Sequence, residues 1–250
     1  MTQLLVHELR NQQRLFWRSR ESAVFAFMLP IALLVLLGAV YGDRDIDGVQ
    51  GASYLLAGML GFGIVATAFA GLAINLVIRR ESGILKRVRG TPLPGGVYLG
   101  AVIASMIVVI ALQTGAQLVI GLFVIDADLS ASAGALVVAL LLGTISFAAL
   151  GLAMTAAVRS AEGSSAVVTA VYLPMVFISG SFFAVEQLPS FLEAVADVLP
   201  LTYLLNFLRA SLIDGEEIGS SLTAVAVLLL WGAVGLAIAA RTFRWEPRAA

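Results

Sequence analysis

The sequence RRESGILKRVRGTPLP, which runs from Arg79 to Pro94, decides the fold of this chain. It holds five of the 15 basic residues and separates two long apolar runs, at about residues 52–78 and 97–125. A basic segment between two membrane-length runs stays on the cytoplasmic side, because Lys and Arg near span ends fix the orientation of a membrane protein. The stretch therefore predicts a chain that crosses a membrane and turns at its inner face here.

The composition extends this prediction to the whole chain. Of the 250 residues, 60% are hydrophobic and 12% are charged, whereas soluble domains have about 25% charged residues. Several apolar runs exceed the ~18 residues that mark a membrane-spanning helix. We therefore expect an all-α membrane protein, with one transmembrane domain over residues 1–250, in the cell membrane.

Six runs are long enough to cross the bilayer, at about residues 23–41, 52–78, 97–125, 133–158, 164–183 and 221–240. A seventh span from Leu199 to Ile213 is the alternative, but this run is short and contains Asn206 and Arg209, whereas a crossing takes about 20 apolar residues. With six spans only Arg44 and Arg209 of the 15 basic residues fall outside (15 − 2 = 13 inside), and 11 of the 16 acidic residues are external. This asymmetry predicts six spans with both termini in the cytoplasm.

Two segments outside the spans are expected to be helical. In residues 1–22, Arg10, Arg14 and Arg18 recur at four-residue spacing, which predicts an amphipathic helix in the cytoplasmic interface. A positive flank that only orients the first span is the alternative. Residues 184–220 contain two short apolar helical patterns divided by Pro200. We expect short re-entrant helices in the outer leaflet there, with a packed loop as the alternative.

Polar residues inside the spans are few. The six runs contain no Asp, Glu, Lys, Arg or His, so they lack the mid-membrane relays that proton-coupled transporters use. Gln113 and Gln117 lie four residues apart and share a helical face. They are interpreted either as interhelical glue or, with Asn75 and Tyr172, as a candidate substrate path.

Residues for catalysis, metal binding or nucleotide hydrolysis are not indicated. The chain has no cysteine and one histidine, His7, so neither a His/Cys metal site nor a Ser-His-Asp set is predicted. Its only lysine, Lys86, is not part of a G-x-x-x-x-G-K-[ST] phosphate-binding loop. We expect no enzyme activity, no cofactor, no metal and no nucleic-acid partner, and an energy source in a second polypeptide if transport is active.

Two segments and the span count follow a known pattern. The segment from Arg80 to Leu93 fits RE-x-G … L/R … TP, and the outer segment fits P…SG-x-F…LP…PL-x-Y…R. The outer residues that fit are Pro174, Ser179, Gly180, Phe183, Leu188, Pro189, Pro200, Leu201, Tyr203 and Arg209. With six spans behind an amphipathic helix, the chain resembles the ABC-2 type permeases of bacterial ATP-binding-cassette exporters, including drug-resistance permeases of the daunorubicin type.

The resemblance implies a half-transporter: two permeases, alike or different, and two ATPase subunits that bind ATP and Mg. The implied ATPase-coupling residues lie in the loop 79–94 and are Arg80, Glu81, Gly83, Lys86, Arg87, Arg89, Thr91 and Pro92. The candidate outer gate consists of Ser179, Gly180, Phe183 and Tyr203. The chain lacks the long external domain of larger members, which favours a substrate that enters from the bilayer.

The implied function is ATP-driven export of a hydrophobic or amphiphilic compound, drug-like or lipid-like, from the cytoplasm or inner leaflet. Membrane lipids are expected neighbours. Two other functions fit the same residues: a non-conducting membrane subunit of a resistance or sensing complex, and a passive channel or facilitator.

Overall fold

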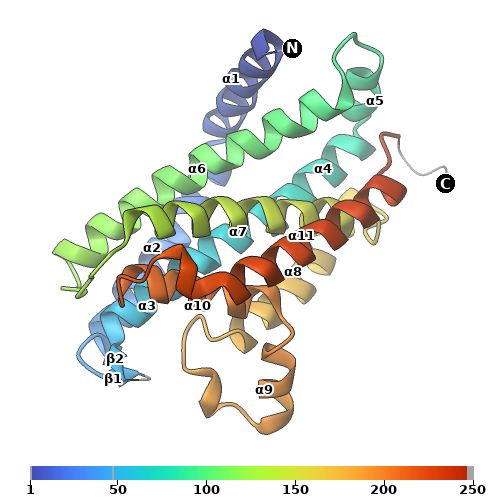
Figure 1. Ribbon diagram of the computed structural model, residues 1–250. Helices are drawn as coiled ribbons and strands as arrows, with labels where there is room; N and C mark the ends of the chain where they lie inside the picture. The colour runs from blue at the N-terminus through green and yellow to red at the C-terminus, as the bar shows by residue number, and fades with distance from the viewer. Residues whose placement is uncertain (1, 47, 247–250) are drawn as a thin grey trace.

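The computed structural model describes residues 2–46 and 48–246 as a bundle of helices that run between two ends (Figure 1). Asp47 and Arg248, which the charge count above includes, lie outside these residues. We call the end that carries α1 (Thr2–Arg18) and α5 (Ile84–Arg89) the basic end. The opposite end, with the β1–β2 hairpin and α9 (Ser190–Ala196), is called the acidic end.

Six helical segments of the described chain are long and apolar enough to cross a membrane, as predicted. Single helices form four of them: α2 (Arg20–Tyr41), α6 (Gly95–Phe123), α7 (Ala133–Met154) and α8 (Ala161–Ile178). The second span joins α3 (Gly51–Ile64), η1 (Val65–Gly71) and α4 (Leu72–Glu81), and the sixth joins η3 (Ile218–Ser221) and α11 (Leu222–Thr242). The fifth span ends at Ile178 instead of the predicted Phe183, because Gly180 takes a left-handed φ of 84°.

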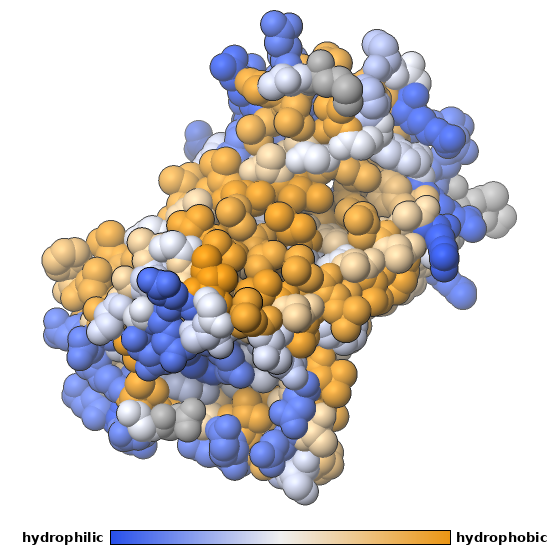
Figure 2. Space-filling model, viewed as in Figure 1, coloured by the Kyte–Doolittle hydropathy of each residue, from blue (hydrophilic) through white to orange (hydrophobic). Residues whose placement is uncertain are grey.

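The surface between the two ends is apolar. Figure 2 shows a broad hydrophobic region between hydrophilic ends, in the same orientation as Figure 1. Large apolar side chains are exposed on the spanning helices, for example Phe25 on α2, Phe123 on α6 and Leu230 on α11. A bundle that crosses a bilayer exposes such a surface to lipid, and satisfies its backbone hydrogen bonds within its own helices.

Helix α3 forms the centre of the bundle, and every one of its residues is buried. It packs against α2, α6 and α10. Close approach depends on glycine: a Cβ at Gly61 would lie 2.4 Å from Cδ2 of Leu205 in α10. Small residues allow such contacts where no hydrophobic force drives helices together in lipid. Just beyond α3, η1 is a seven-residue π-helix. This form is rare in proteins overall, but it often occurs near functional sites.

Helices α9 and α10 (Pro200–Leu212) form the predicted pair of short helices and meet at 78°. Five leucines of α10 are 0% exposed, so the helix packs inside the bundle: Leu201, Leu204, Leu205, Leu208 and Leu212. At its end, the carbonyls of Ser211 and Leu212 accept hydrogen bonds from the N–H groups of Ser132 and Ser130, at 2.8 and 3.0 Å. Because Ser130 and Ser132 lie in the α6–α7 loop at the acidic end, α10 returns to the side from which it started. The alternative seventh span is therefore not formed.

Short connections complete the acidic end. Strands β1 (Asp45–Ile46) and β2 (Val49–Gln50) form an antiparallel pair, and η2 (Val185–Gln187) precedes α9. The Gln50 side chain donates to the carbonyl of Asp126 at 3.1 Å. This bond ties the hairpin to the α6–α7 loop.

Helix α1 forms where an amphipathic helix was predicted, and it packs along α6. The Gln13 side chain donates to the Ser105 carbonyl at 2.8 Å and to its hydroxyl at 3.0 Å. Arg10, Arg14 and Arg18 are exposed. The polar contacts of α1 with the bundle are therefore made by neutral residues, and its arginines remain outside.

The packing of α11 on α7 gives a stability prediction. A Cβ at Gly235 would lie 2.8 Å from the backbone C of Ala149 and N of Leu150. Because backbone atoms cannot move aside, Gly235→Ala should lower the free energy of unfolding by about 1–3 kcal/mol. Thermal melting of the purified protein in detergent measures this loss. The control is Gly115→Ala on α6, where nothing lies within 4 Å of the new Cβ; equal losses in both variants would contradict this packing.

Candidate functional site

The segment between α4 and α6 begins with a buried arginine. Arg80 is 2% exposed, and its Nη1 and Nη2 donate to the carbonyls of Thr155 and Val158, at 3.0 and 2.8 Å. Its Nε donates to the Glu81 carboxylate at 2.9 Å. A buried charge is tolerated when it is paired and hydrogen-bonded in this way. Arg80 therefore joins the second span to the turn between α7 and α8, and its guanidinium is directed into the fold.

Helix α5 starts after a left-handed glycine. Gly83 has φ 72° and ψ 8°, a conformation that glycine adopts without steric cost. The implied coupling segment 79–94 is therefore divided, because α4 ends at Glu81 and the turn at Gly83 starts α5 at Ile84. Leu85 is 0% exposed and fixes α5 to the bundle.

The outward side of α5 is cationic. Lys86, Arg87 and Arg89 are exposed, and none of them forms an ion pair with another described residue. Thr91 ends the helix, because its hydroxyl donates to the Val88 carbonyl at 2.6 Å, and the exposed Pro92 follows. The basic end thus presents three charges on a short helix, a surface that suits an acidic partner.

The candidate substrate path is distributed over three helices. Gln113 and Gln117 lie on one face of α6, as their spacing predicts, and that face is directed toward α3: the Gln117 amide donates to the Met59 carbonyl at 3.4 Å. A Cβ at Gly63 would lie 2.2 Å from Gln113 Nε2. Within the described chain, Gln113 Nε2 and Oε1 and Gln117 Oε1 are buried without a hydrogen-bond partner. Buried amide groups nearly always have hydrogen-bond partners. A role in holding helices together by hydrogen bonds therefore accounts for one amide atom of Gln117 and for neither amide atom of Gln113.

The other two residues of this path lie elsewhere. Asn75 on α4 donates to the Gly71 carbonyl at 2.8 Å and lines a cavity of about 380 Å³ beside α1. Tyr172 is half-buried on α8. The cavity takes in Asn75 but not Gln113, Gln117 or Tyr172.

The candidate outer gate is organised by two residues outside the predicted set. The Tyr54 hydroxyl of α3 donates to the carbonyls of Gly180 and Phe183, both at 3.1 Å. The Arg209 guanidinium of α10 lies 3.9 Å from the Tyr54 ring centre and also donates to the Gly180 carbonyl. This arrangement holds the end of α8 onto α3 and α10 through hydrogen bonds and a cation–π contact.

The remaining gate residues are placed around this cluster. Ser179 is 0% exposed, whereas the Tyr203 hydroxyl donates to the Asp197 carbonyl, at 2.9 Å, and so joins α10 to the end of α9. Tyr54 could have been singled out from the sequence, because it is a lone tyrosine in an apolar run that is rich in Gly, Ala and Leu. A tyrosine hydroxyl that is buried there needs a hydrogen-bond partner.

In the described chain, six membrane-length helical segments, a pair of short helices at one end and a cationic helix at the other define a polytopic membrane protein. Residues 3–213 match the family described as ABC-2 type transporter, and the chain belongs to this family. It is thus a transmembrane permease subunit, a transport component that is not itself catalytic, and the family implies association with an ABC ATPase.

Two relatives are similar to this chain. "Putative transport permease YvfS" of Bacillus subtilis (strain 168) is 23% identical over 184 residues, which cover 73% of this chain and 75% of that protein. "Nodulation protein J" of Rhizobium leguminosarum bv. viciae is 32% identical over 87 residues, or 35% of this chain and 33% of that protein. The second similarity therefore spans about one third of each protein.

Proposed function

We propose that this chain is the permease half of an ATP-driven exporter of hydrophobic or amphiphilic compounds. Two such permeases, identical or paralogous, combine with two ATPase subunits, and ATP and Mg bind to the ATPases. The observation that carries this proposal is α5: a cationic helix that is exposed outward and fixed inward by the buried Leu85. Family membership supports it, as does the name of the Bacillus subtilis relative, a transport permease.

The basic end faces the cytoplasm in this proposal. Of the 15 Lys and Arg residues, Arg248 is not described; of the other 14, all but Arg44 and Arg209 belong to the basic end (15 − 1 − 2 = 12). The excess of Lys and Arg near span ends marks the cytoplasmic side. Both α1 and the end of α11 then lie inside, where an ATPase can reach α5.

Movement of α5 would be transmitted by two short connections. Only Ser82 and Gly83 separate α5 from α4, so a displaced α5 pulls on the second span. Arg80 then passes the displacement to the α7–α8 turn through Thr155 and Val158. Helices that shift as rigid elements at an interface are a known switching device. Tyr54 lies near the far end of the second span and Gly180 just beyond the far end of α8. Both belong to the Tyr54–Gly180–Arg209 cluster, which we propose as the outer gate.

Gln113 is proposed to contact the exported compound. Because both its amide atoms are buried without a partner in the described chain, Gln113→Leu removes two unpaired polar atoms and should not lower the free energy of unfolding. The same change should alter the relative export rates of substrates with and without hydrogen-bonding groups. Thermal melting and vesicle transport measure the two effects. A loss of stability with unchanged substrate preference would contradict the proposed contact.

Purification of the tagged chain from its host membrane tests the proposed function. The expected result is a co-purified ATPase with a phosphate-binding loop, at about one per permease, and ATP-dependent movement of an amphiphile in reconstituted vesicles. Movement without ATP would identify a passive facilitator. An ATPase complex with no movement of any compound would identify a non-conducting subunit.

A further inference from the structure

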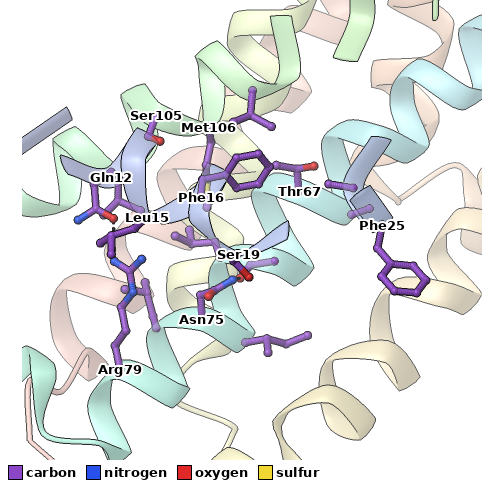
Figure 3. Close-up of a pocket in the computed structure, with 18 residues that line it drawn as sticks. Gln12, Leu15, Phe16, Ser19, Phe25, Thr67, Asn75, Arg79, Ser105 and Met106 are labelled. Atoms are coloured by element: carbon purple, nitrogen blue, oxygen red, sulfur yellow. Dashed lines mark hydrogen bonds between the residues drawn. The ribbon is translucent and has the colours of Figure 1, made fainter. Parts of the chain in front are cut away.

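A cavity of about 380 Å³ lies between α1, the start of α2, the η1–α4 segment and α6. Figure 3 shows Gln12, Leu15 and Phe16 of α1 on one side of it, and Asn75 and Arg79 of α4 on the other. Most of the wall is apolar, and Arg79 is the only charged residue among the described residues that line it. The function proposed above does not use this cavity.

Arg79 has no counter-charge within the described chain. It is half-buried, and its Nη1 donates to Gln12 Oε1 and to the Tyr98 hydroxyl, both at 2.8 Å. Both acceptors are neutral, and no described carboxylate forms an ion pair with it. A guanidinium offers five donors in a planar fork, and within the described chain these two bonds of Nη1 leave Nη2 and Nε available beside the cavity. Within the described chain the guanidinium therefore has no direct carboxylate partner; the Glu8 carboxylate accepts a hydrogen bond from Gln12 Nε2, at 2.6 Å, and does not pair with Arg79.

The cavity also has a polar end and an apolar end. Arg79 lies two residues from the end of α4 at the basic end. Thr67 precedes it by 12 residues, or about 18 Å at 1.5 Å per residue, and Figure 3 shows Thr67 and Phe25 away from Arg79. The π-helix contributes only small side chains to this wall, those of Ala66 and Thr67, together with Gly71. The lining thus runs from a cation near the membrane surface to apolar walls deeper in the bundle.

We infer that this cavity binds an amphiphile with an anionic headgroup, a phosphate or a carboxylate, whose tail lies against the apolar wall. Arg79 contacts the headgroup, because the planar guanidinium pairs with phosphate and carboxylate through two parallel hydrogen bonds. A membrane phospholipid and an anionic exported compound share this chemistry. The site needs no ATPase, so its binding is independent of the proposed export function.

Competition binding to the purified full chain in dodecyl maltoside tests this site. Native mass spectrometry counts the lipids retained from equimolar phosphatidylglycerol and phosphatidylcholine with identical acyl chains. We expect phosphatidylglycerol to be preferred by at least about tenfold, which corresponds to about 1.4 kcal/mol. Arg79→Gln should reduce the preference to about one. The matched control is Arg159→Gln, an exposed arginine in the α7–α8 turn at the same end, which should leave the preference intact.

A second variant covers the case in which Arg79→Gln loosens α1. Thr67→Phe fills the apolar end and leaves the Arg79 contacts in place, so it should reduce the retention of both lipids. Equal retention of the two lipids by the unaltered chain, or equal loss of preference in the Arg79 and Arg159 variants, would overturn the inference. Dodecyl phosphate, added as a third competitor, distinguishes the sources: tighter binding of phosphatidylglycerol indicates a resident lipid, and tighter binding of dodecyl phosphate a single-chain exported compound.

Discussion

Reversal of two charges on α5, in the double variant Lys86→Glu/Arg87→Glu, should release the ATPase and abolish ATP-dependent transport. Both side chains are exposed and have no ion-pair partner in the described chain, so the change leaves the fold intact and acts on the partner. Like charges brought together at an interface disfavour association by several kcal/mol, and we expect at least about a 100-fold weaker complex. Titration of the purified permease with its ATPase and transport in vesicles measure both effects.

The matched control is Arg241→Glu/Arg244→Glu. These arginines lie at the same end, at and just beyond the end of α11, and are also exposed. The control reverses the same number of charges. A general electrostatic effect would therefore weaken the complex with the ATPase equally in both variants. Retention of the ATPase by the α5 variant, at the melting temperature of the unaltered protein, would place the docking surface elsewhere.

Arg80→Gln should destabilise the permease and uncouple it while the ATPase stays bound. The change removes two bonds to the carbonyls of Thr155 and Val158 and leaves Glu81 unpaired. Loss of one partner of a buried ion pair costs about 3–5 kcal/mol, and a value near 3 is expected because Glu81 is partly exposed. Melting in detergent gives the stability, and the ratio of ATP hydrolysed to compound moved gives the coupling.

Glu81→Gln separates the two contributions of Arg80. It removes the ion pair, whereas both carbonyl bonds of Arg80 remain, so its effect should be less than half that of Arg80→Gln. If both variants melt like the unaltered protein, Arg80 does not connect α4 to the α7–α8 turn as the structure shows. A Glu81→Arg variant would disturb this pair before it disturbed any docking surface.

Hydropathy was sufficient to predict the six spans, because whether a segment can cross a membrane depends on the residues of that segment alone. The π-helix at η1 was not predicted, since Val65–Gly71 has the same small, apolar composition as α3, which precedes it. Similarly, Arg80 and Arg87 are equivalent basic residues in one loop by sequence. Arg80 is buried because its acceptors come from residues 75 and 78 positions away, and no local pattern contains such a contact.

The candidate sites show the same contrast between properties of a local segment, which the sequence predicts, and contacts between distant residues, which it does not. Helical spacing correctly put Gln113 and Gln117 on one face, but which helix they would meet depended on tertiary packing against Gly63 and Met59. Asn75 and Tyr172 were grouped with them only as polar residues in apolar spans, and they lie on other helices. At the outer gate, the glycine signal at Gly180 was local, whereas the Tyr54 contact spans 126 positions.

Docking of a cytoplasmic ATPase on α5 can be tested directly, because the chain contains no cysteine and Arg87→Cys therefore introduces a single thiol. In intact, transporting cells, a membrane-permeant thiol-to-amine cross-linker should join position 87 to an ATPase with a phosphate-binding loop. Protection of that thiol from an impermeant maleimide would accompany this result. An adduct without ATPase, or labelling of position 87 from outside the cell, would contradict the docking of α5 on a cytoplasmic ATPase.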